Sequence, residues 1–207
     1  PILKNKAFFF VNAEAVKNST PATTWVAAGS TNIGQVTRVA KADLEEVSDI
    51  LNRKFGYVTG PYEAYNNKVN SMKLLARLDF NINDQNKLTL RYTHHDSEAD
   101  VNISSSASLG FGNRTTRFEA MSYQNSGYII GDNTRSAVME LNSTFSDKIS
   151  NNFSVGYDFQ DENRQYKGAL FPTIDILKDN ATYISTGMDP FTPDNKLSYG
   201  TLHFTDN

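Results

Sequence analysis

The chain of 207 residues contains no cysteine. This absence excludes a small secreted domain that is stabilised by disulfides, and it excludes any metal site built from thiolates. Lysine and arginine number 20 against 23 aspartate and glutamate residues, so the formal net charge is −3. Domains that bind nucleic acid normally carry a basic surplus. We therefore expect no nucleic acid among the partners.

Long apolar runs and catalytic motifs are also missing. The hydrophobic fraction is 39%, and no stretch approaches the roughly 20 apolar residues that a membrane-spanning helix needs. The sequence has no Gly-x-Ser-x-Gly, no phosphate-binding glycine loop and no His-Glu-x-x-His. No pair of carboxylates is arranged as the acid and nucleophile of a glycosidase. We therefore predict a protein that is not an enzyme and that uses no cofactor.

What the chain does contain is a series of segments in which every second residue is apolar or aromatic. The clearest is 74–83, where apolar side chains alternate with Arg77, Asp79 and two asparagines. A helix would scatter these charges around its axis, whereas a strand places them on one face. Residues 87–95 alternate in the same way after the short turn 84–86, so the two segments predict a hairpin.

A second hairpin and two outer strands follow from the same pattern. The second hairpin runs over residues 136–160, with its turn at 146–151. Alternating segments at 6–15 and 196–205 indicate the outer strands. Together these segments predict six antiparallel strands of about ten residues each in up-and-down order.

The predicted connections alternate between short and long. Three long connections, 16–73, 97–134 and 163–195, are separated by the two short turns. A compact soluble domain rarely carries even one structureless loop above about 15 residues. Outer-membrane β-barrels have short periplasmic turns and long external loops, and the smallest close with about 8 strands. We therefore predict an all-β fold in which six strands form an arc of a large transmembrane β-barrel, with the long connections as external loops.

The ends of the chain lead to a further expectation. Residues 1–6 include two lysines and lack the apolar core of a signal peptide, which an exported protein requires. The last alternating segment stops near the start of its next turn. We therefore expect that the 207 residues are a segment of a longer polypeptide.

One helix is predicted inside the first long connection, from Asp43 to Gly56. Apolar residues recur there at helical spacing, and Gly56 suits the position that follows a helix. Asp43 and Glu46 are spaced as a capping box. Two interpretations of the apolar stripe remain open. It packs against aromatic residues of its own loop, namely Tyr57, Tyr62 and Tyr65, or it serves as a lid or a docking surface for a partner.

Histidine and acidic residues gather at the end of the first hairpin, from His94 to Asp100. Asp96, Glu98 and Asp100 carry the oxygen ligands that a hard cation such as Ca²⁺ prefers. In a strand, His94 and His95 point to opposite faces and cannot share one ion. The second interpretation is a solvated strand end that continues into an acidic loop.

Aromatic and charged residues divide between the two faces of the predicted wall. Six phenylalanines are expected at the periplasmic end of the strands, where they would form an interfacial girdle: Phe8, Phe9, Phe10, Phe80, Phe145 and Phe153. The alternative is that they pack the core of a β-sandwich. The opposite face carries five charged residues that we expect to line the lumen, because charges are costly to bury in a sandwich core: Arg77, Asp79, Arg91, Glu140 and Asp158.

Several segments resemble, in the same order, those of one known family. Residues 1–14, with two lysines followed by three consecutive phenylalanines, resemble the junction between plug and barrel in TonB-dependent outer-membrane receptors. They are most similar to the Oar-like branch of Bacteroidota and myxobacteria, which is related to the SusC-like receptors. The resemblance continues through residues 74–92, 189–197 and 204–207.

This resemblance implies an active transporter in the outer membrane. It implies a barrel of about 22 strands that takes up a nutrient such as a glycan, a peptide or a chelate. The implied partners are outer-membrane lipid, the receptor's own plug domain, the TonB complex and a surface lipoprotein. An alternative stays open, in which the chain is a non-transport surface protein that uses its long loops for binding or adhesion.

Overall fold

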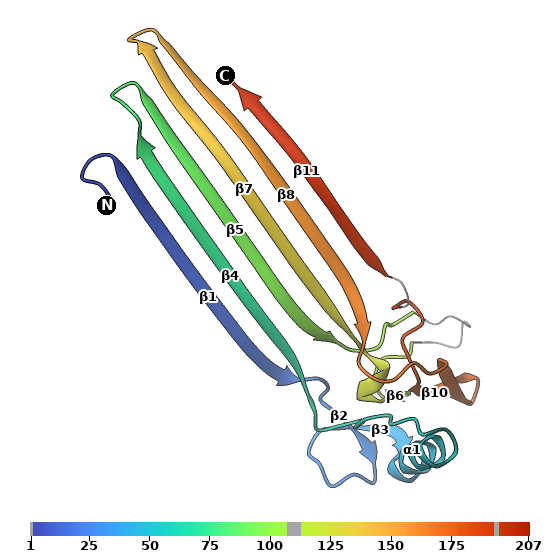
Figure 1. The fold of residues 1–207 in the computed structure, drawn as a ribbon. Helices are drawn as coiled ribbons and strands as arrows, with labels where there is room; N and C mark the ends of the chain where they lie inside the picture. The colour runs from blue at the N-terminus through green and yellow to red at the C-terminus, as the bar shows by residue number, and fades with distance from the viewer. Residues whose placement is uncertain (1, 107–112, 193–194) are drawn as a thin grey trace.

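The computed structural model describes residues 2–106, 113–192 and 195–207. Its main feature is an antiparallel sheet of six long strands (Figure 1). In spatial order these are β1 (Ala7–Pro21), β4 (Asn66–Asn81), β5 (Asn86–Val101), β7 (Tyr128–Ser146), β8 (Ile149–Tyr166) and β11 (Lys196–Asp206). Each long strand pairs with the long strand before or after it in the sequence, so the predicted up-and-down order is confirmed.

Most of these strands are longer than the alternation predicted. Residues 16–21 pair with residues 66–71, although the sequence had assigned both to the first long connection. The predicted bounds 16–73, 97–134 and 163–195 are therefore too wide, and the connections are 22–65, 102–127 and 167–195. At 16–21 and 66–71 the extra residues are mostly polar on both faces, so they lack the alternation that reveals a strand.

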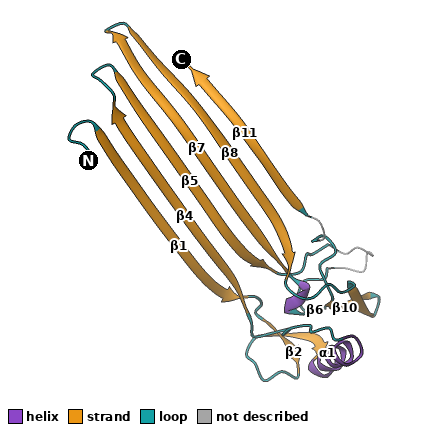
Figure 2. Cartoon of the chain, in the orientation of Figure 1, coloured by secondary structure: helices purple, strands orange, loops and turns teal. Residues whose placement is uncertain are grey.

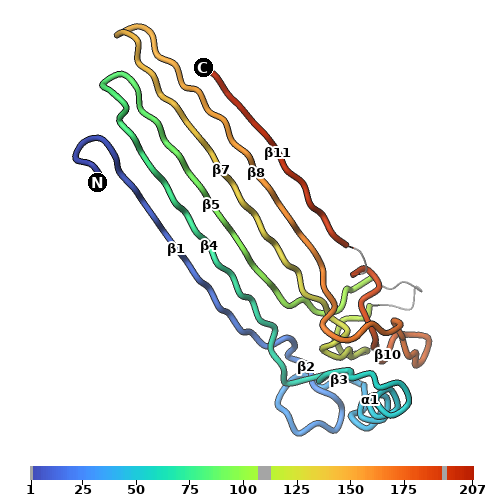
Figure 3. Tube along the Cα trace, viewed as in Figure 1, coloured from blue at the N-terminus to red at the C-terminus, as the bar shows by residue number. Residues whose placement is uncertain are grey.

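The short turns lie at the opposite end of the sheet from these connections. In the turn between β4 and β5, the Asn83 carbonyl oxygen Oδ1 accepts hydrogen bonds from the backbone N–H groups of Gln85 (2.9 Å) and Asn86 (2.8 Å). Only Asp147 and Lys148 separate β7 from β8. Both ends of the chain also lie at this end of the sheet (Figure 3).

The long connections fold together into a second unit at the other end of the sheet. We call this unit the cap and define it as residues 22–65, 102–106, 113–127 and 167–192. It contains β2 (Trp25–Ala28), β3 (Gln35–Ala40), α1 (Lys41–Phe55), β6 (Met121–Ser122), the 3₁₀ turn η1 (Gln124–Ser126), β9 (Ile174–Lys178) and β10 (Ala181–Thr186). Strands β6, β10 and β9 form one sheet, and β2 pairs in parallel with β3. The helices drawn in Figure 2 lie in this unit.

Helix α1 confirms the predicted helix but not its predicted start. Ala40 occupies the N-cap position without a capping side chain. The capping box is wrong, because Asp43 lies within the first turn and its carboxylate accepts a hydrogen bond from the Tyr183 hydroxyl at 2.7 Å. At the other end, Gly56 has φ of 66° and its N–H bonds to Asn52, which confirms the predicted stop. No helix within the described ranges is long and apolar enough to cross a membrane.

The buried core of the protein lies in the cap and draws on all three long connections. Its members are Ala27, Val39, Leu44, Met121, Tyr123, Tyr183 and Ile184. The Tyr123 hydroxyl donates a hydrogen bond to the carbonyl of Leu44 at 2.6 Å. Leu44 and Val47 of α1 therefore pack in a core that contains aromatic residues from the other two connections, whereas Phe55 is 64% exposed.

The three tyrosines expected beneath the helix have different surroundings. Tyr62 packs against the cap core and meets Tyr123 edge to face at 6.1 Å between ring centroids. Tyr57 stacks on Phe171 of the third connection at 4.3 Å. Tyr65 lines a cavity where the cap meets the long strands. The interpretation that the helix packs against aromatic residues of its own loop is thus correct for Tyr62. Tyr57 and Tyr65 lie against other parts of the chain.

Candidate functional site

The register of the long strands gives the sheet two different faces. Residues directly opposite each other in antiparallel strands point to the same face, so a row of side chains can be followed across all six strands. One such row is entirely apolar and consists of Phe9, Leu78, Leu90, Met139, Val155 and Phe204. This row defines what we call the apolar face.

Three further rows extend the apolar face on either side of the first. They contain Ala7, Phe80, Leu88, Leu141, Phe153 and Asp206; Val11, Ala76, Tyr92, Ala137, Tyr157 and Leu202; and Ala13, Leu74, His94, Arg135, Phe159 and Gly200. We call the four rows the apolar band. It covers about 20 Å along the strands, at roughly 3.4 Å per residue. Several of its large side chains are exposed. Leu78, Tyr92 and Met139 in the inner strands are exposed by 36–38%, and Leu202 (70%) and Phe204 (75%) lie on the edge strand β11.

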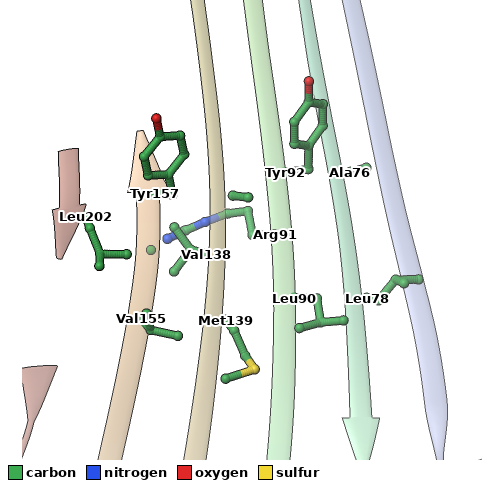
Figure 4. Close-up of a pocket in the computed structure, with 12 residues that line it drawn as sticks. Ala76, Leu78, Leu90, Arg91, Tyr92, Val138, Met139, Val155, Tyr157 and Leu202 are labelled. Carbon is green, nitrogen blue, oxygen red and sulfur yellow. The ribbon is translucent and has the colours of Figure 1, made fainter. Parts of the chain in front are cut away.

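The centre of the band is shown in Figure 4. A shallow cavity of about 480 Å³ lies there, lined mainly by side chains of the apolar face. Tyr92 and Tyr157 direct their hydroxyls away from the row that contains Leu90 and Met139 (Figure 4). Tyrosines with an apolar ring and a polar tip are typical of the boundary between hydrocarbon and water.

The opposite face, which we call the polar face, holds a cluster of paired charges. Arg77 donates to both carboxylate oxygens of Asp79 at 2.8–3.0 Å, and the Thr89 hydroxyl donates to the same carboxylate at 2.8 Å. Glu140, directly opposite Thr89, accepts hydrogen bonds from the side-chain amides of Asn142 (2.8 Å) and Asn152 (2.9 Å). The cluster thus crosses β4, β5, β7 and β8.

The five charged residues predicted to share one face do so. Arg91 lies opposite Arg77, so the ion pair of Arg77 with Asp79 offsets the repulsion between the two guanidinium groups. Asp158 lies further along the polar face and contacts His203 of β11 at 3.4 Å. The structure therefore brings Arg77, Asp79, Arg91 and Glu140 together and leaves Asp158 in a separate pair.

The six phenylalanines all lie near the short turns, but they do not share a face. Phe9, Phe80 and Phe153 belong to the apolar band. Phe8 and Phe10 lie on the polar face, because they stand opposite Asp79 and Arg77. Phe145 is 61% exposed beside the β7–β8 turn. The prediction of one girdle is therefore wrong for Phe8 and Phe10, since consecutive residues in a strand point to opposite sides.

The predicted hard-cation ligands lie within β5 instead of a loop. Asp96 accepts a hydrogen bond from Asn133 at 2.8 Å, and Asp100 forms an ion pair with Lys167 at 3.3 Å. Burial lowers the pKa of Lys167, while the Asp100 carboxylate opposes this effect. Within the described ranges, no group of three or more histidine, aspartate or glutamate side chains is placed to hold a metal ion. Alternate strand positions keep Asp96, Glu98 and Asp100 apart along the strand.

Sequence reasoning missed the buried polar contacts that join the long connections. Arg114 and Asp189 are both fully buried, with Arg114 Nη2 at 3.8 Å from Asp189 Oδ2. Asp189 also accepts hydrogen bonds from the backbone N–H groups of Ser104 (2.7 Å) and Phe191 (2.9 Å). The two side chains come from different connections, so no local pattern could reveal their contact.

Comparisons of the chain with protein-family models, with curated proteins and with solved structures find no match. The two faces of the sheet and the cap are therefore the features from which a function can be inferred.

Proposed function

We propose that the long strands are part of the wall of an outer-membrane β-barrel, in an active transporter of the TonB-dependent receptor type. The apolar face would meet outer-membrane lipid, and the polar face would line the lumen beside a plug domain. The observation that carries this proposal is the apolar band, which keeps its register across all six strands.

The band is difficult to reconcile with a face that meets water. Soluble monomers rarely expose contiguous apolar patches above a few hundred Å². Here the band contains Phe9 and Leu202, exposed by 60% and 70%, among many neighbours of the same kind. A lipid environment removes this cost, and a band of about 25 Å is what outer-membrane barrels present to it.

The edges of the sheet favour further strands on both sides. β1 and β11 each have one neighbour in the sheet, so each presents a row of unpaired backbone groups. Such groups are costly in hydrocarbon unless the sheet closes into a barrel. We propose that closure comes from additional strands of the complete receptor.

The two ends of the sheet support an orientation. Short turns occur at one end and the cap at the other (Figure 1), as in barrels with periplasmic turns and external loops. The cap would then face the outside and contribute to nutrient capture, together with a surface lipoprotein. The TonB complex would act on the plug from the periplasmic side. In this proposal the chain binds and transports, and it catalyses no reaction.

The proposal is tested by the way the chain partitions between water and lipid. The complete receptor, which carries these strands together with those that close the sheet, is purified in detergent and then diluted either into buffer or into phospholipid vesicles. We expect aggregation in buffer and, with vesicles, flotation that resists an alkaline wash. Limited proteolysis should cut the cap and spare the segments of the apolar band. A uniform soluble species without detergent would contradict the proposal.

A second candidate is a surface module for binding or adhesion that does not transport. It is favoured by the cap, which has a buried core of its own drawn from all three long connections. A cap of this kind can bind a partner whether the sheet contacts lipid or water. Uniform solubility without detergent would favour this candidate.

A further inference from the structure

A cavity of about 320 Å³ lies where the cap meets the ends of β1 and β4. Its size falls in the range of about 300–1,000 Å³ that is typical of small-molecule sites. The side chains that matter for its chemistry are those of Thr23, Thr24, Trp25, Asn32, Tyr65 and Asn66. They come from three separate parts of the chain.

The lining of this cavity is neutral. Of the residues that the structure describes, ten line it, and none of these is an acid, a lysine, an arginine or a histidine. Tyr65 is the single group among them that can ionise. Burial, with a smaller contribution from the Asp100 carboxylate, raises the pKa of Tyr65 to about 12. The phenol therefore keeps its proton at neutral pH and can donate a hydrogen bond.

Some polar groups of the lining form hydrogen bonds within the protein. These bonds leave other acceptors and hydroxyls of the lining available to a ligand. The side-chain NH₂ of Asn32 donates to Glu63 at 2.9 Å, and that of Asn66 donates to Ser19 at 3.0 Å. The side-chain carbonyl oxygens of Asn32 and Asn66 are then oriented away from those two hydrogen bonds. The Thr23 hydroxyl oxygen accepts from the Trp25 N–H at 3.0 Å, so its proton can still be donated.

The backbone beside the cavity has one unusual feature. Ala64, in the lining, has φ of 55°, in the left-handed region that residues other than glycine seldom adopt. Backbone strain of this kind is concentrated at ligand-binding positions.

We infer that the cavity binds a neutral ligand with several hydroxyl groups and an apolar ring face, as presented by a pyranose unit of an oligosaccharide. The rings of Trp25 and Tyr65 offer apolar surface to the ring face. The amide carbonyls and hydroxyls offer hydrogen bonds to the hydroxyl groups. A charged ligand would lose its hydration and find no opposite charge in the lining. The site lies in the cap region and requires no contact between the apolar band and lipid.

The test uses Trp25, which is the only tryptophan in the chain. Its emission is followed during titration with maltotriose, cellotriose, mannotriose and xylotriose, and with trigalacturonate and trilysine as charged probes. We expect a saturable change with at least one neutral trisaccharide and none with the charged probes. No saturable response to any neutral probe would overturn the inference, as would an equal response to the charged ones.

Variants decide whether the response comes from this cavity. Thr24→Val removes a hydroxyl at nearly constant shape, and Tyr65→Phe removes the phenol, so each should weaken binding about five-fold. The matched control is Asn52→Ala, which lies at a different cavity beside α1 and should bind like the unaltered chain. Unchanged affinity in both cavity variants, each with unaltered emission before titration, would overturn the inference.

The result is independent of the outcome for the proposed function. Absence of sugar binding in a chain that inserts into vesicles overturns this inference alone. Sugar binding by a chain that is soluble without detergent supports the inference and contradicts the transporter.

Discussion

The imidazole of His203 lies directly over Gly156 of the neighbouring strand. The two residues are opposite each other in the β8–β11 pair, and a Cβ atom on Gly156 would overlap the imidazole. From this position His203 Nδ1 reaches Asp158 at 3.4 Å. On the other face, the Tyr157 hydroxyl occupies the space where Gly200 lacks a side chain. In addition to their antiparallel pairing, β11 and β8 thus have side-chain contacts on both faces.

Substitution of Gly156 should loosen β11. In Gly156→Ala the new methyl group displaces the partly exposed imidazole from Asp158, which we expect to destabilise the β8–β11 pair by less than about 1 kcal/mol. Hydrogen exchange measures this directly, and the amides of β11 should exchange faster while those of β4 and β5 stay unchanged. Ser154→Ala, on the same strand and face, is the control. Equal hydrogen-exchange rates of the β11 amides in both variants would contradict the proposed packing of His203 over Gly156.

Truncation of the cap core should unfold the cap and spare the long strands. Leu44 is fully buried in the core of the cap, so Leu44→Ala should cost about 2–5 kcal/mol. Urea unfolding followed by the emission of Trp25 reports on the cap. Val58→Ala, at a 62% exposed position, is the control and should change little. A simultaneous loss of the long strands at the same urea concentration would show that the cap is not a separate cooperative unit.

Removal of one partner from the buried ion pair should be costly. Asp189→Ala leaves the Arg114 guanidinium buried without its carboxylate and removes the acceptor of two backbone N–H groups. We expect a loss of about 3–5 kcal/mol in cap stability. Asp179→Ala removes the exposed partner of Arg38, paired at 2.9 Å, and should cost less than about 1 kcal/mol. Equal losses of cap stability in Asp189→Ala and Asp179→Ala would show that burial does not set the cost of removing the carboxylate.

Alkaline pH should destabilise the cap before it affects the sheet. Burial raises the pKa of Tyr57, Tyr62, Tyr65 and Tyr123, whereas unfolded tyrosine ionises near pH 10. Because the folded state holds these protons more tightly, their contribution to stability is complete below about pH 10 and is lost as the pH rises through the folded values.

The absorbance of tyrosinate measures this effect. Four of the ten tyrosines should titrate late, and their ionisation should coincide with a change in Trp25 emission. Tyr65→Phe should remove one late group, which in the folded chain has a pKa of about 12. Titration of all tyrosines in one step near pH 10, with the cap intact, would contradict this account.

The sequence predicts those parts of the fold in which the physical pattern is local. Alternation revealed the six long strands and their order, and the spacing of apolar residues with Gly56 revealed α1. The same reasoning missed the strand ends between the apolar band and the cap, such as 16–21 and 66–71, because both of their faces are mostly polar. It also missed the core of the cap.

The missed features depend on contacts between distant residues. Tyr123 and Tyr183 join α1 from connections far away in the sequence, and strands as short as β6 carry no periodicity. Among the candidate site residues, alternation placed the charged residues of the polar face correctly. It also required Phe8 and Phe10 to face away from Phe9, and the apolar run of three phenylalanines obscured this requirement.

The most direct test of the lipid-facing wall is a pair of labels on adjacent residues of β5. Because the chain has no cysteine, a single nitroxide can be attached at Leu90→Cys or at Arg91→Cys in vesicles that contain the protein. We predict that the label at Leu90 is accessible to oxygen dissolved in lipid, and that the label at Arg91 is accessible to a water-soluble nickel chelate.

Two other positions complete this measurement. Met139→Cys, opposite Leu90 on β7, should behave like Leu90→Cys. Asn70→Cys lies nearer the cap on the same face and should be accessible to the chelate. We predict that labels within the band alternate between access to lipid and access to water, and that labels between the band and the cap are accessible to water alone. Equal access of the chelate to the labels at Leu90 and Arg91 would contradict a wall that faces lipid.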